Sequence, residues 1–295
     1  MADKYTRKQF QAQYPDDEAC LQAVLARRYG STDVCPHCGV VGKLTRIEGR
    51  RAFACKEGCH IYPCAGTVFE KSSTALTDWF YAMYLMTATR NGVSAKELQR
   101  QLGVTYKCAW RIGHQIRELM SARDEANNPG PLSGHVEIDE TYVGGKRKGK
   151  GQMGKKSHRT IVMGVLQRKG SVKTSIVPNV QRVTLLPIVK ANVAIGSTIS
   201  TDELSSYRTL AKHGYIHGTV DHGSEEYVSG IHHTNSIEGF WSHLKRGIRS
   251  THASVSPKHL SKYVNEFAFR YNNRHAPSEM FHRMLAQISK PQGYK

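Results

Sequence analysis

The strongest constraint on the fold is a short acidic stretch in the middle of the chain. Residues 135–145 read His-Val-Glu-Ile-Asp-Glu-Thr-Tyr-Val-Gly-Gly, which is typical of a β-strand that ends in two glycines. Val136, Ile138 and Tyr142 fit a buried face. Asp139 alternates with them on the opposite face, where a carboxylate costs free energy unless it is paired or holds a cation. Asp139 is therefore either a salt-bridged surface residue or part of a cation site.

Two later acidic stretches favour the cation site. Asp202 directly follows a predicted strand at residues 197–201. Glu238 lies in a predicted helix at residues 235–249. Lys245 follows Glu238 by two helical turns and therefore shares its face.

The order of the predicted elements indicates how these residues come together. A three-stranded meander comes first, and helices then alternate with strands before a helical end. The predicted ranges are 135–143, 160–166 and 172–177 for the meander, then 185–193, 197–201, 205–212, 218–220, 235–249 and 257–274. This is the order of a ribonuclease-H-like α/β domain. In that order the first strand lies mid-sheet, the strand ending at Asp202 lies beside it, and the helix bearing Glu238 crosses near their ends.

Carboxylates that converge in this way need a counter-charge, because their mutual repulsion raises their pKa values. Two divalent cations supply it, and hard oxygen ligands select Mg²⁺ or Mn²⁺. Two ions roughly 3.5–4 Å apart can activate a nucleophile and stabilise the leaving oxygen of a phosphoryl displacement. Lys245 is placed to hold a phosphate nearby. Of the remaining acids, Glu137 shares the side of Asp139 and is expected to support the site, whereas Glu140 points away and is expected to be structural.

Two cysteine pairs near the N-terminus match a zinc ribbon, in which four thiolates close one tetrahedral, structural Zn²⁺ site. The first pair is Cys35 and Cys38, and the second is Cys55 and Cys59. The second pair has three intervening residues instead of two, so His60 and Cys64 are possible substitutes for Cys59. The alternative interpretation is a set of scattered buried cysteines.

The rest of the N-terminal half is predicted to be helical. Residues 76–88 are apolar nearly all round and indicate a buried helix, and residues 92–120 resemble a helix-turn-helix. Its second helix carries basic residues that suit a recognition helix, although such helix pairs also occur as plain packing units. These residues are Lys107, Arg111, His114 and Arg117. The predicted domains are a helical lead-in at 1–30, a zinc ribbon at 31–70, a helical DNA-binding region at 71–125, the α/β domain at 132–275 and a C-terminal tail at 276–295.

The charge of the chain indicates a polyanionic partner. The formal net charge is +18 and the isoelectric point about 9.7, which indicates nucleic acid or, less often, an anionic membrane. The predicted recognition helix favours double-stranded DNA. A basic stretch follows the acidic strand and is either a solvated flexible loop or a loop that binds the phosphate backbone. The predicted DNA-binding residues here and on the later helix are Lys146, Arg147, Lys148, Lys150, Lys155, Lys156, Arg159, Lys245 and Arg246. No signal-peptide core or membrane span is evident, so a cytoplasmic protein without a membrane partner is expected.

An ordered set of motifs resembles bacterial insertion-sequence transposases of the zinc-ribbon DDE type, insertion-sequence family fifteen-ninety-five. The motifs are Cys-Pro-His-Cys at 35–38, Ala-Gly-Thr-Val-Phe at 65–69, Ile-Asp-Glu-Thr-Tyr-Val-Gly-Gly at 138–145, Thr-Asp at 201–202, Asn-Ser-Ile-Glu-Gly-Phe-Trp at 235–241, Leu-Lys-Arg-Gly at 244–247 and His-Leu-Ser-Lys-Tyr-Val-Asn-Glu-Phe-Ala-Phe-Arg-Tyr-Asn at 259–272. Each motif alone is weak, but the ordered set is specific and covers nearly the whole chain.

The resemblance implies a retroviral-integrase-like fold and metal-dependent cutting and joining of DNA at terminal inverted repeats. It implies Asp139 and Asp202 as metal ligands, and it leaves Asn235 and Glu238 as candidates for the third. We favour Glu238, because a carboxylate binds Mg²⁺ better than an amide does. Cutting of paired ends implies a dimer or larger oligomer, acting in the bacterial cytoplasm on nucleoid DNA.

Two other functions fit parts of the sequence. A DNA-binding regulator derived from a transposase would keep the ribbon and the helix-turn-helix but would lose an acidic residue, and none is visibly lost. A nuclease that hydrolyses without joining would use the same metal site.

Overall fold

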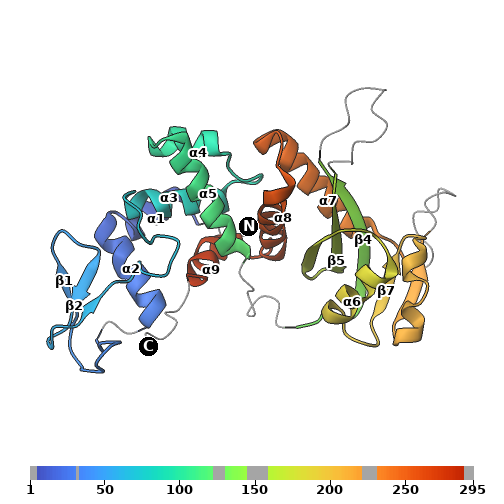
Figure 1. Ribbon diagram of the computed structural model, residues 1–295, viewed down its shortest axis with the longest axis horizontal. Helices are drawn as coiled ribbons and strands as arrows, with labels where there is room; N and C mark the ends of the chain where they lie inside the picture. Colours follow the sequence, from blue (N-terminus) through green and yellow to red (C-terminus); the bar gives the residue numbers. More distant parts are fainter. Residues whose placement is uncertain (1–4, 31–32, 122–129, 145–158, 221–230, 289–295) are drawn as a thin grey trace. The chain divides into compact units, whose positions relative to one another are not determined.

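The computed structural model describes residues 5–30, 33–121, 130–144, 159–220 and 231–288 (Figure 1). The chain divides into two compact units. The first comprises residues 1–122 and 275–295, and the second comprises residues 123–274. The second unit contains the three acidic stretches, and the first contains the cysteine pairs and the helix-turn-helix.

A five-stranded mixed sheet forms the centre of the second unit. Its order is β6-β5-β4-β7-β8, and the strands are β4 (His135–Val143), β5 (Thr160–Gln167), β6 (Val172–Val177), β7 (Thr198–Thr201) and β8 (Ile216–Thr219). β4, β5 and β6 form the antiparallel meander, and β7 and β8 continue the sheet in parallel with β4. This confirms the predicted ribonuclease-H-like order, with β4 in the middle.

Helices cover the two faces of this sheet and bury a separate core on each. Helix α6 (Arg182–Asn192) packs over one face, where Val136 and Ile138 are fully buried. Helices α7 (Asn235–Gly247) and α8 (Leu260–Asn272) cover the other (Figure 1). Because successive strand residues point to opposite faces, Glu137 and Asp139 of β4 point toward the side of α7.

Three details differ from the sequence-based expectation. Tyr142 is 51% exposed, so its assignment to the buried face was wrong: it lies near the end of β4 and is not part of the core cluster on that face, which from β4 contains Val136 and Ile138. The helix expected at 205–212 is two short 3₁₀ turns, Ser205–Tyr207 and Leu210–His213. Helix α7 continues through a π-helical turn, Ile248–His252, and Pro257–His259 forms a 3₁₀ turn before α8.

The first unit joins a small sheet to a helical core. Strands β1 (Thr45–Ile47), β2 (Ala52–Ala54) and β3 (His60–Ile61) form an antiparallel ribbon. The helices are α1 (Arg7–Gln13), α2 (Asp17–Tyr29), α3 (Leu76–Ala88), α4 (Ala95–Leu102), α5 (Tyr106–Ser121) and α9 (Met280–Ala286), the last preceded by a 3₁₀ turn at Pro277–Glu279. The helix predicted at 76–88 is confirmed as the buried α3, with Trp79 and Phe80 fully buried. Within the described residues, no helix is both long and apolar enough to cross a membrane.

The C-terminal part of the chain contributes to the core of the first unit. Residues 276–295 were expected to form a tail, but α9 buries Phe281 and Met284 there. The ring of Phe281 lies 5.7 Å from that of Phe10 and 6.1 Å from that of Phe80. The helix α9 has only 7 residues, so its apolar pattern is too short to predict a stable helix without the helices that it packs against.

Candidate active site

The strand register brings Asp139 and Asp202 to the same edge of the sheet. Glu137 of β4 pairs with Ser200 of β7 in parallel, and Asp139 and Asp202 each lie two residues beyond this pair. Asp202 is the first residue after β7, and its Oδ1 accepts a hydrogen bond of 3.1 Å from the Leu204 N–H. The two carboxylates therefore leave neighbouring strands at corresponding positions.

The charges of the other two predicted acids affect the pKa of Asp139. Burial, together with the smaller effects of the Asp202 and Glu238 charges, raises the pKa of Asp139 to about 6. Hydrogen bonds from the Glu140 N–H and the Trp241 side chain act in the opposite direction. Since the charges of Asp202 and Glu238 disfavour ionisation of Asp139, a cation bound among the three acids would relieve the repulsion. An all-oxygen donor set of this kind fits Mg²⁺ or Mn²⁺.

Trp241 orients Asp139 from helix α7. Its buried indole Nε1 donates a 3.0 Å hydrogen bond to Asp139 Oδ2. The ring packs on Gly164 of β5, which pairs with Asp139, and a Cβ at that position would lie 2.6 Å from the ring. Trp241 belongs to the motif at 235–241, and its role beside Asp139 was not predicted. A glycine within an apolar strand is the signal for such a close approach.

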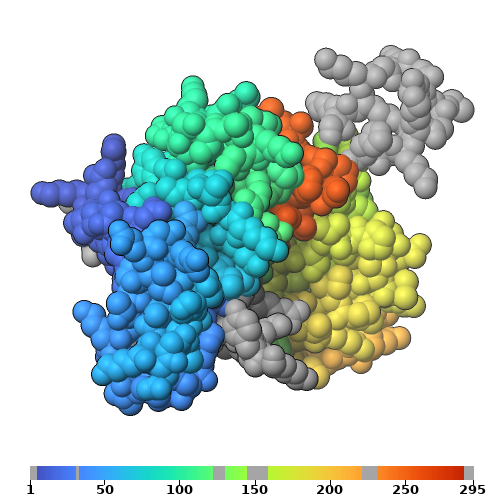
Figure 2. Space-filling model, turned by 60° about the vertical axis from the view of Figure 1, so that its left-hand side comes forward, coloured from blue at the N-terminus to red at the C-terminus, as the bar shows by residue number. Residues whose placement is uncertain are grey.

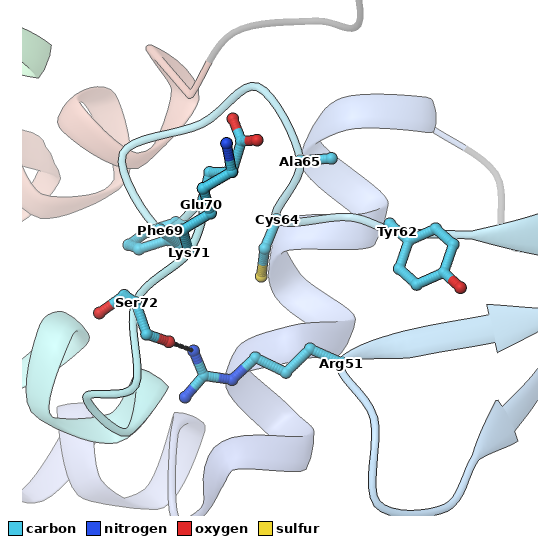
Figure 3. A pocket seen from close by; sticks show the side chains of 8 residues that line it. All are labelled: Arg51, Tyr62, Cys64, Ala65, Phe69, Glu70, Lys71 and Ser72. Carbon is cyan, nitrogen blue, oxygen red and sulfur yellow. Dashed lines mark hydrogen bonds between the residues drawn. The ribbon is translucent and has the colours of Figure 1, made fainter.

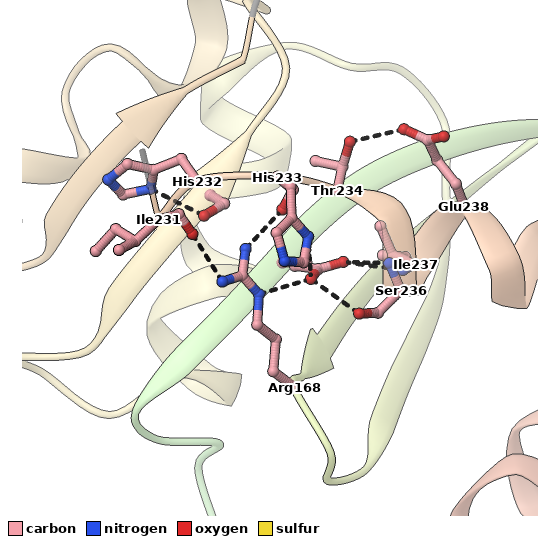
Figure 4. A network of polar contacts seen from close by, with 10 residues as sticks. Arg168, Ile231, His232, His233, Thr234, Ser236, Ile237 and Glu238 are labelled. Atoms are coloured by element: carbon pink, nitrogen blue, oxygen red, sulfur yellow. Dashed lines mark hydrogen bonds and ion pairs between the residues drawn. The ribbon is translucent and has the colours of Figure 1, made fainter. Parts of the chain in front are cut away.

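The other predicted site residues lie along α7. Glu238 is in the first turn, where its Oε1 accepts a 2.7 Å hydrogen bond from Thr234 Oγ1 (Figure 4). Asn235 is exposed at the first residue of the helix, and Lys245 is half-buried two turns after Glu238. Glu238 is near enough for its charge to raise the pKa of Asp139, although the three acids do not meet as a metal-ligand cluster among the described residues. Asn235 lies one helical turn before Glu238.

The two further acids of β4 have different surroundings. Glu137 is fully buried on the side of α7 and bonds to Arg168 and to the start of that helix. Glu140 lies on the opposite face and accepts a hydrogen bond from the Tyr207 hydroxyl. Burial raises the pKa of Glu140 to about 7, with smaller contributions from the charges of Asp139 and Asp202. The two side chains point to opposite faces as expected, and their supporting and structural roles stay predictions.

The four predicted cysteines form the one metal-ligand cluster found among the described residues. The Sγ atoms of Cys35, Cys38, Cys55 and Cys59 all lie within 4.8 Å of one another. The sulfurs of Cys38 and Cys55 are 3.7 Å apart, close to the roughly 3.8 Å separation expected for tetrahedral Zn–S bonds of about 2.3 Å. The donor set therefore fits a structural Zn²⁺ ion.

The structure distinguishes Cys59 from the two alternatives that spacing left open. The extra residue of the second pair is accommodated because Gly58 adopts a φ of +78°, which lets the Cys59 N–H approach Cys55 Sγ at 3.3 Å. His60 is exposed on β3. Cys64 is buried outside the cluster and lines a separate pocket with Arg51 and neighbouring residues (Figure 3).

Of the four basic residues named on the predicted recognition helix α5, two are exposed and two are buried. Lys107 and Arg111 are exposed. His114 and Arg117 are buried, so they are not available as DNA contacts: the His114 ring stacks on Trp110 at 3.8 Å between centroids, and Arg117 donates to a backbone carbonyl. Figure 2 shows the green surface of α4 and α5 on one face of the first unit.

Aromatic residues that the sequence analysis did not select accompany this surface. Tyr106 is 46% exposed, with Lys96 Nζ lying 4.9 Å from its ring centroid, and Trp110 is 36% exposed. Of the remaining predicted DNA-binding residues, Arg159 and Arg246 are exposed. The other predicted basic residues of the loop, Lys146, Arg147, Lys148, Lys150, Lys155 and Lys156, lie outside the described residues.

Comparisons with known proteins agree with these features. The profile of the ISXO2-like transposase domain matches residues 131–272, and that of the transposase zinc-ribbon domain matches residues 15–61. An uncharacterized protein in transposable element ISH50 of Halobacterium salinarum is 30% identical over 224 residues, which are 70% of this chain and 72% of that protein. The chain belongs to the ISXO2-like transposase family.

A second relative supports the family assignment. An uncharacterized transposase-like protein of Haemophilus influenzae is 33% identical over 122 residues, which are 41% of this chain and 96% of that protein.

The crystal structure of the Mos1 strand transfer complex aligns with 72% of this chain and 79% of that chain, at 12% identity and a TM-score of 0.28. An alignment this loose carries no conclusion. The transposase-domain match spans all three acids, and the zinc-ribbon match spans all four clustered cysteines.

Proposed function

We propose that this transposase cuts DNA at the terminal inverted repeats of an insertion sequence and joins the released ends to target DNA. Asp139, Asp202 and Glu238 would hold two Mg²⁺ or Mn²⁺ ions. The observation that carries this proposal is the strand register that places Asp139 and Asp202 at one sheet edge, together with the effect of the Asp202 and Glu238 charges on the pKa of Asp139. Ions bound there would supply Lewis-acid activation of the nucleophile and stabilisation of the leaving oxygen.

The reaction has two phosphoryl-transfer steps. In the first, a water oxygen forms a bond to phosphorus at the element's end, and the bond from that phosphorus to the 3′ oxygen breaks and leaves a 3′-hydroxyl. In the second, that 3′-hydroxyl attacks a target phosphodiester in line with its bond to the target's own 3′ oxygen, which leaves. Lys245 would hold a phosphate near the acids, while Trp241 keeps Asp139 oriented.

DNA binding is assigned to several basic surfaces. Lys107 and Arg111 of α5 would enter the major groove, and the basic residues of 146–159 together with Arg246 would contact phosphates. One Zn²⁺ on the four clustered cysteines would stabilise the ribbon without a catalytic role. Because two ends are cut, we expect the active form to be a dimer or larger, working on DNA in the bacterial cytoplasm.

A cleavage and strand-transfer assay tests the proposal. Labelled DNA with the element's own ends is incubated with the wild type, Asp139→Ala, Glu238→Gln or Asn235→Ala, with and without Mg²⁺ or Mn²⁺. The expected result is metal-dependent nicking that is abolished in Asp139→Ala and Glu238→Gln and retained in Asn235→Ala. Loss of activity in Asn235→Ala but not in Glu238→Gln would make the amide the third ligand. Specific binding without nicking under either metal would instead favour a DNA-binding regulator.

A further inference from the structure

A buried polar network holds the segment that leads into helix α7. Glu137 is at its centre and is 0% exposed. Its Oε2 accepts hydrogen bonds from the backbone N–H groups of Ser236 at 2.9 Å and Ile237 at 3.0 Å. Its Oε1 accepts from Ser236 Oγ at 3.0 Å and from Arg168 Nε at 2.8 Å. Glu137 thus binds the first turn of α7 to the central strand of the sheet.

Arg168 extends this attachment to the residues before the helix. Its Nη1 donates to the Ile231 carbonyl at 2.7 Å, and its Nη2 donates to the His233 carbonyl at 3.0 Å (Figure 4). The backbone N–H of Arg168 donates a 2.9 Å hydrogen bond to the His135 carbonyl, which holds the base of the Arg168 side chain next to β4. One side chain therefore holds two carbonyls of the incoming segment and the carboxylate of Glu137 at once.

His232 attaches the same segment to the neighbouring strand. Its Nδ1 lies 2.9 Å from the hydroxyl of Ser200, a fully buried residue of β7 two positions before Asp202. The ring occupies space that only a glycine leaves open on β8, because a Cβ at Gly218 would lie 2.3 Å from it. The network therefore contacts β4, β7 and the start of α7, the three elements that carry Asp139, Asp202 and Glu238.

Glu137 supplies the helix cap that Thr234 does not. The side chain of Thr234, the N-cap residue, makes no capping bond and donates to Glu238 instead. The first N–H groups of a helix have no intrahelical acceptor, and an anion near them is also favoured by the helix dipole. Both carboxylate oxygens of Glu137 already accept two hydrogen bonds each from the start of α7 and Arg168, so Glu137 is not suited to bind a cation directly.

We infer that Glu137, held by Arg168, is a positioning residue that fixes Glu238 relative to Asp139 and Asp202 for metal binding. This inference rests on the proposed function. Mg²⁺ requires near-octahedral coordination with metal–oxygen distances of about 2.0–2.1 Å. Each ligand must therefore be held within about 0.5 Å of the position in which it coordinates the ion. Without the buried carboxylate, the first turn of α7 loses its acceptors, and Glu238, one turn into the helix, loses its fixed position.

Direct metal binding tests the inference without relying on activity. Mn²⁺ is titrated into the zinc-loaded full chain, and the free ion is measured by electron paramagnetic resonance. Glu137→Gln should weaken Mn²⁺ binding by about 10–100-fold, the usual range when a group that orients a ligand is changed. The amide keeps the size of the side chain but must turn its NH₂ toward one of the two sets of donors.

Glu266→Gln is the matched control. Glu266 is also fully buried and bonded to an arginine at 2.9 Å, but that arginine, Arg270, lies four residues later on the same helix, α8. The control should lower the thermal midpoint much as Glu137→Gln does and leave Mn²⁺ affinity unchanged. If both variants lower stability and neither changes Mn²⁺ affinity, Glu137 is only structural and the inference is overturned.

Two further variants separate the possible failures. If Asp139→Ala binds Mn²⁺ as tightly as the wild type, the proposed metal site itself is wrong. If Asp139→Ala loses binding while folded Glu137→Gln does not, only the positioning role fails. Should Glu137→Gln not fold, Arg168→Lys takes its place, because lysine retains the charge but cannot reach the carboxylate and both carbonyls together. Wild-type Mn²⁺ affinity in folded Arg168→Lys would refute the inference.

Discussion

Replacement of Trp241 by phenylalanine should shift the pH range over which the acidic site binds a metal ion. The substitution removes the 3.0 Å hydrogen bond from the indole Nε1 to Asp139 Oδ2. A hydrogen bond to a charged group contributes about 1.5–3 kcal/mol, and about 1.4 kcal/mol corresponds to one pKa unit. The pKa of Asp139, which burial already raises to about 6, should therefore rise by a further one to two units in metal-free protein.

The sign of the effect follows from competition between the proton and the metal. A divalent cation binds the ionised carboxylate, so affinity falls as the pH drops through the pKa of Asp139. In Trp241→Phe that fall should occur at a pH about one to two units higher than in the wild type. Mn²⁺ titrations at several pH values between about 5 and 8 measure the midpoint of this loss.

Trp79→Phe provides the control for this experiment. Trp79 is fully buried in the first unit, and its Nε1 donates to the neutral hydroxyl of Ser72 at the same distance of 3.0 Å. The control should lose stability without a change in the pH profile of Mn²⁺ binding. A Trp241→Phe profile that superimposes on the wild type would refute the argument that the indole stabilises the ionised form of Asp139.

Three further predictions concern stability, zinc and DNA. Because the pKa of Asp139 is raised in the folded state, its ionised form lowers the free energy of unfolding at neutral pH, and this cost is lost as the pH falls through about 6 toward the unfolded value of 3.8. In urea unfolding of metal-free protein at neutral pH, the free energy of unfolding of Asp139→Asn should exceed that of the wild type by up to about 3 kcal/mol. A difference that persists below about pH 4 would contradict this. Cys59→Ser should lose the bound zinc and Cys64→Ser should keep one ion per chain by elemental analysis, whereas the reverse result would place the wrong cysteine in the cluster. Lys107→Ala with Arg111→Ala should weaken DNA binding and reduce its salt slope by about 0.9 for each phosphate that the variant no longer neutralises; an unchanged slope would exclude α5 from the interface.

Periodicity predicted those parts of the fold in which one pattern dominates. Residues 76–88 are apolar on nearly every side, and α3 has those same bounds. The β4 stretch alternates, so the opposite directions of Ile138 and Asp139 followed from its period of two. Alternation shows the side to which a residue points but not whether that side is covered at its position, which is why Tyr142 was assigned to the wrong environment. The core role of α9 depends on distant partners such as Phe10, which precedes Phe281 by 271 residues, and no local pattern reports such contacts.

Residue type was a weaker guide than position on the helix. His114 and Arg117 were grouped with the basic residues that suit a recognition helix, yet both are buried in the first unit. The apolar residues of α5 define a buried face, and Arg117 shares it because it follows Gly113 by one helical turn. His114 lies two turns after Lys107, so helical spacing alone places it with the exposed residues, and its burial does not follow from the pattern of α5. Lys107 and Arg111 lie outside that face and remain candidates.

The acidic strand shows how one local pattern can serve separate purposes. Glu137 and Asp139 share a side of β4, but Glu137 is met by the N–H groups of α7 and by Arg168, whereas Asp139 is met by one indole N–H and by other acids. A carboxylate surrounded by donors is stabilised as an anion and keeps its place. A carboxylate surrounded by acids favours the ion that neutralises them. Because the supporting and the metal-binding acid are two residues apart on one strand, any displacement of β4 moves both together, and the distance between the cap of α7 and Asp139 is preserved.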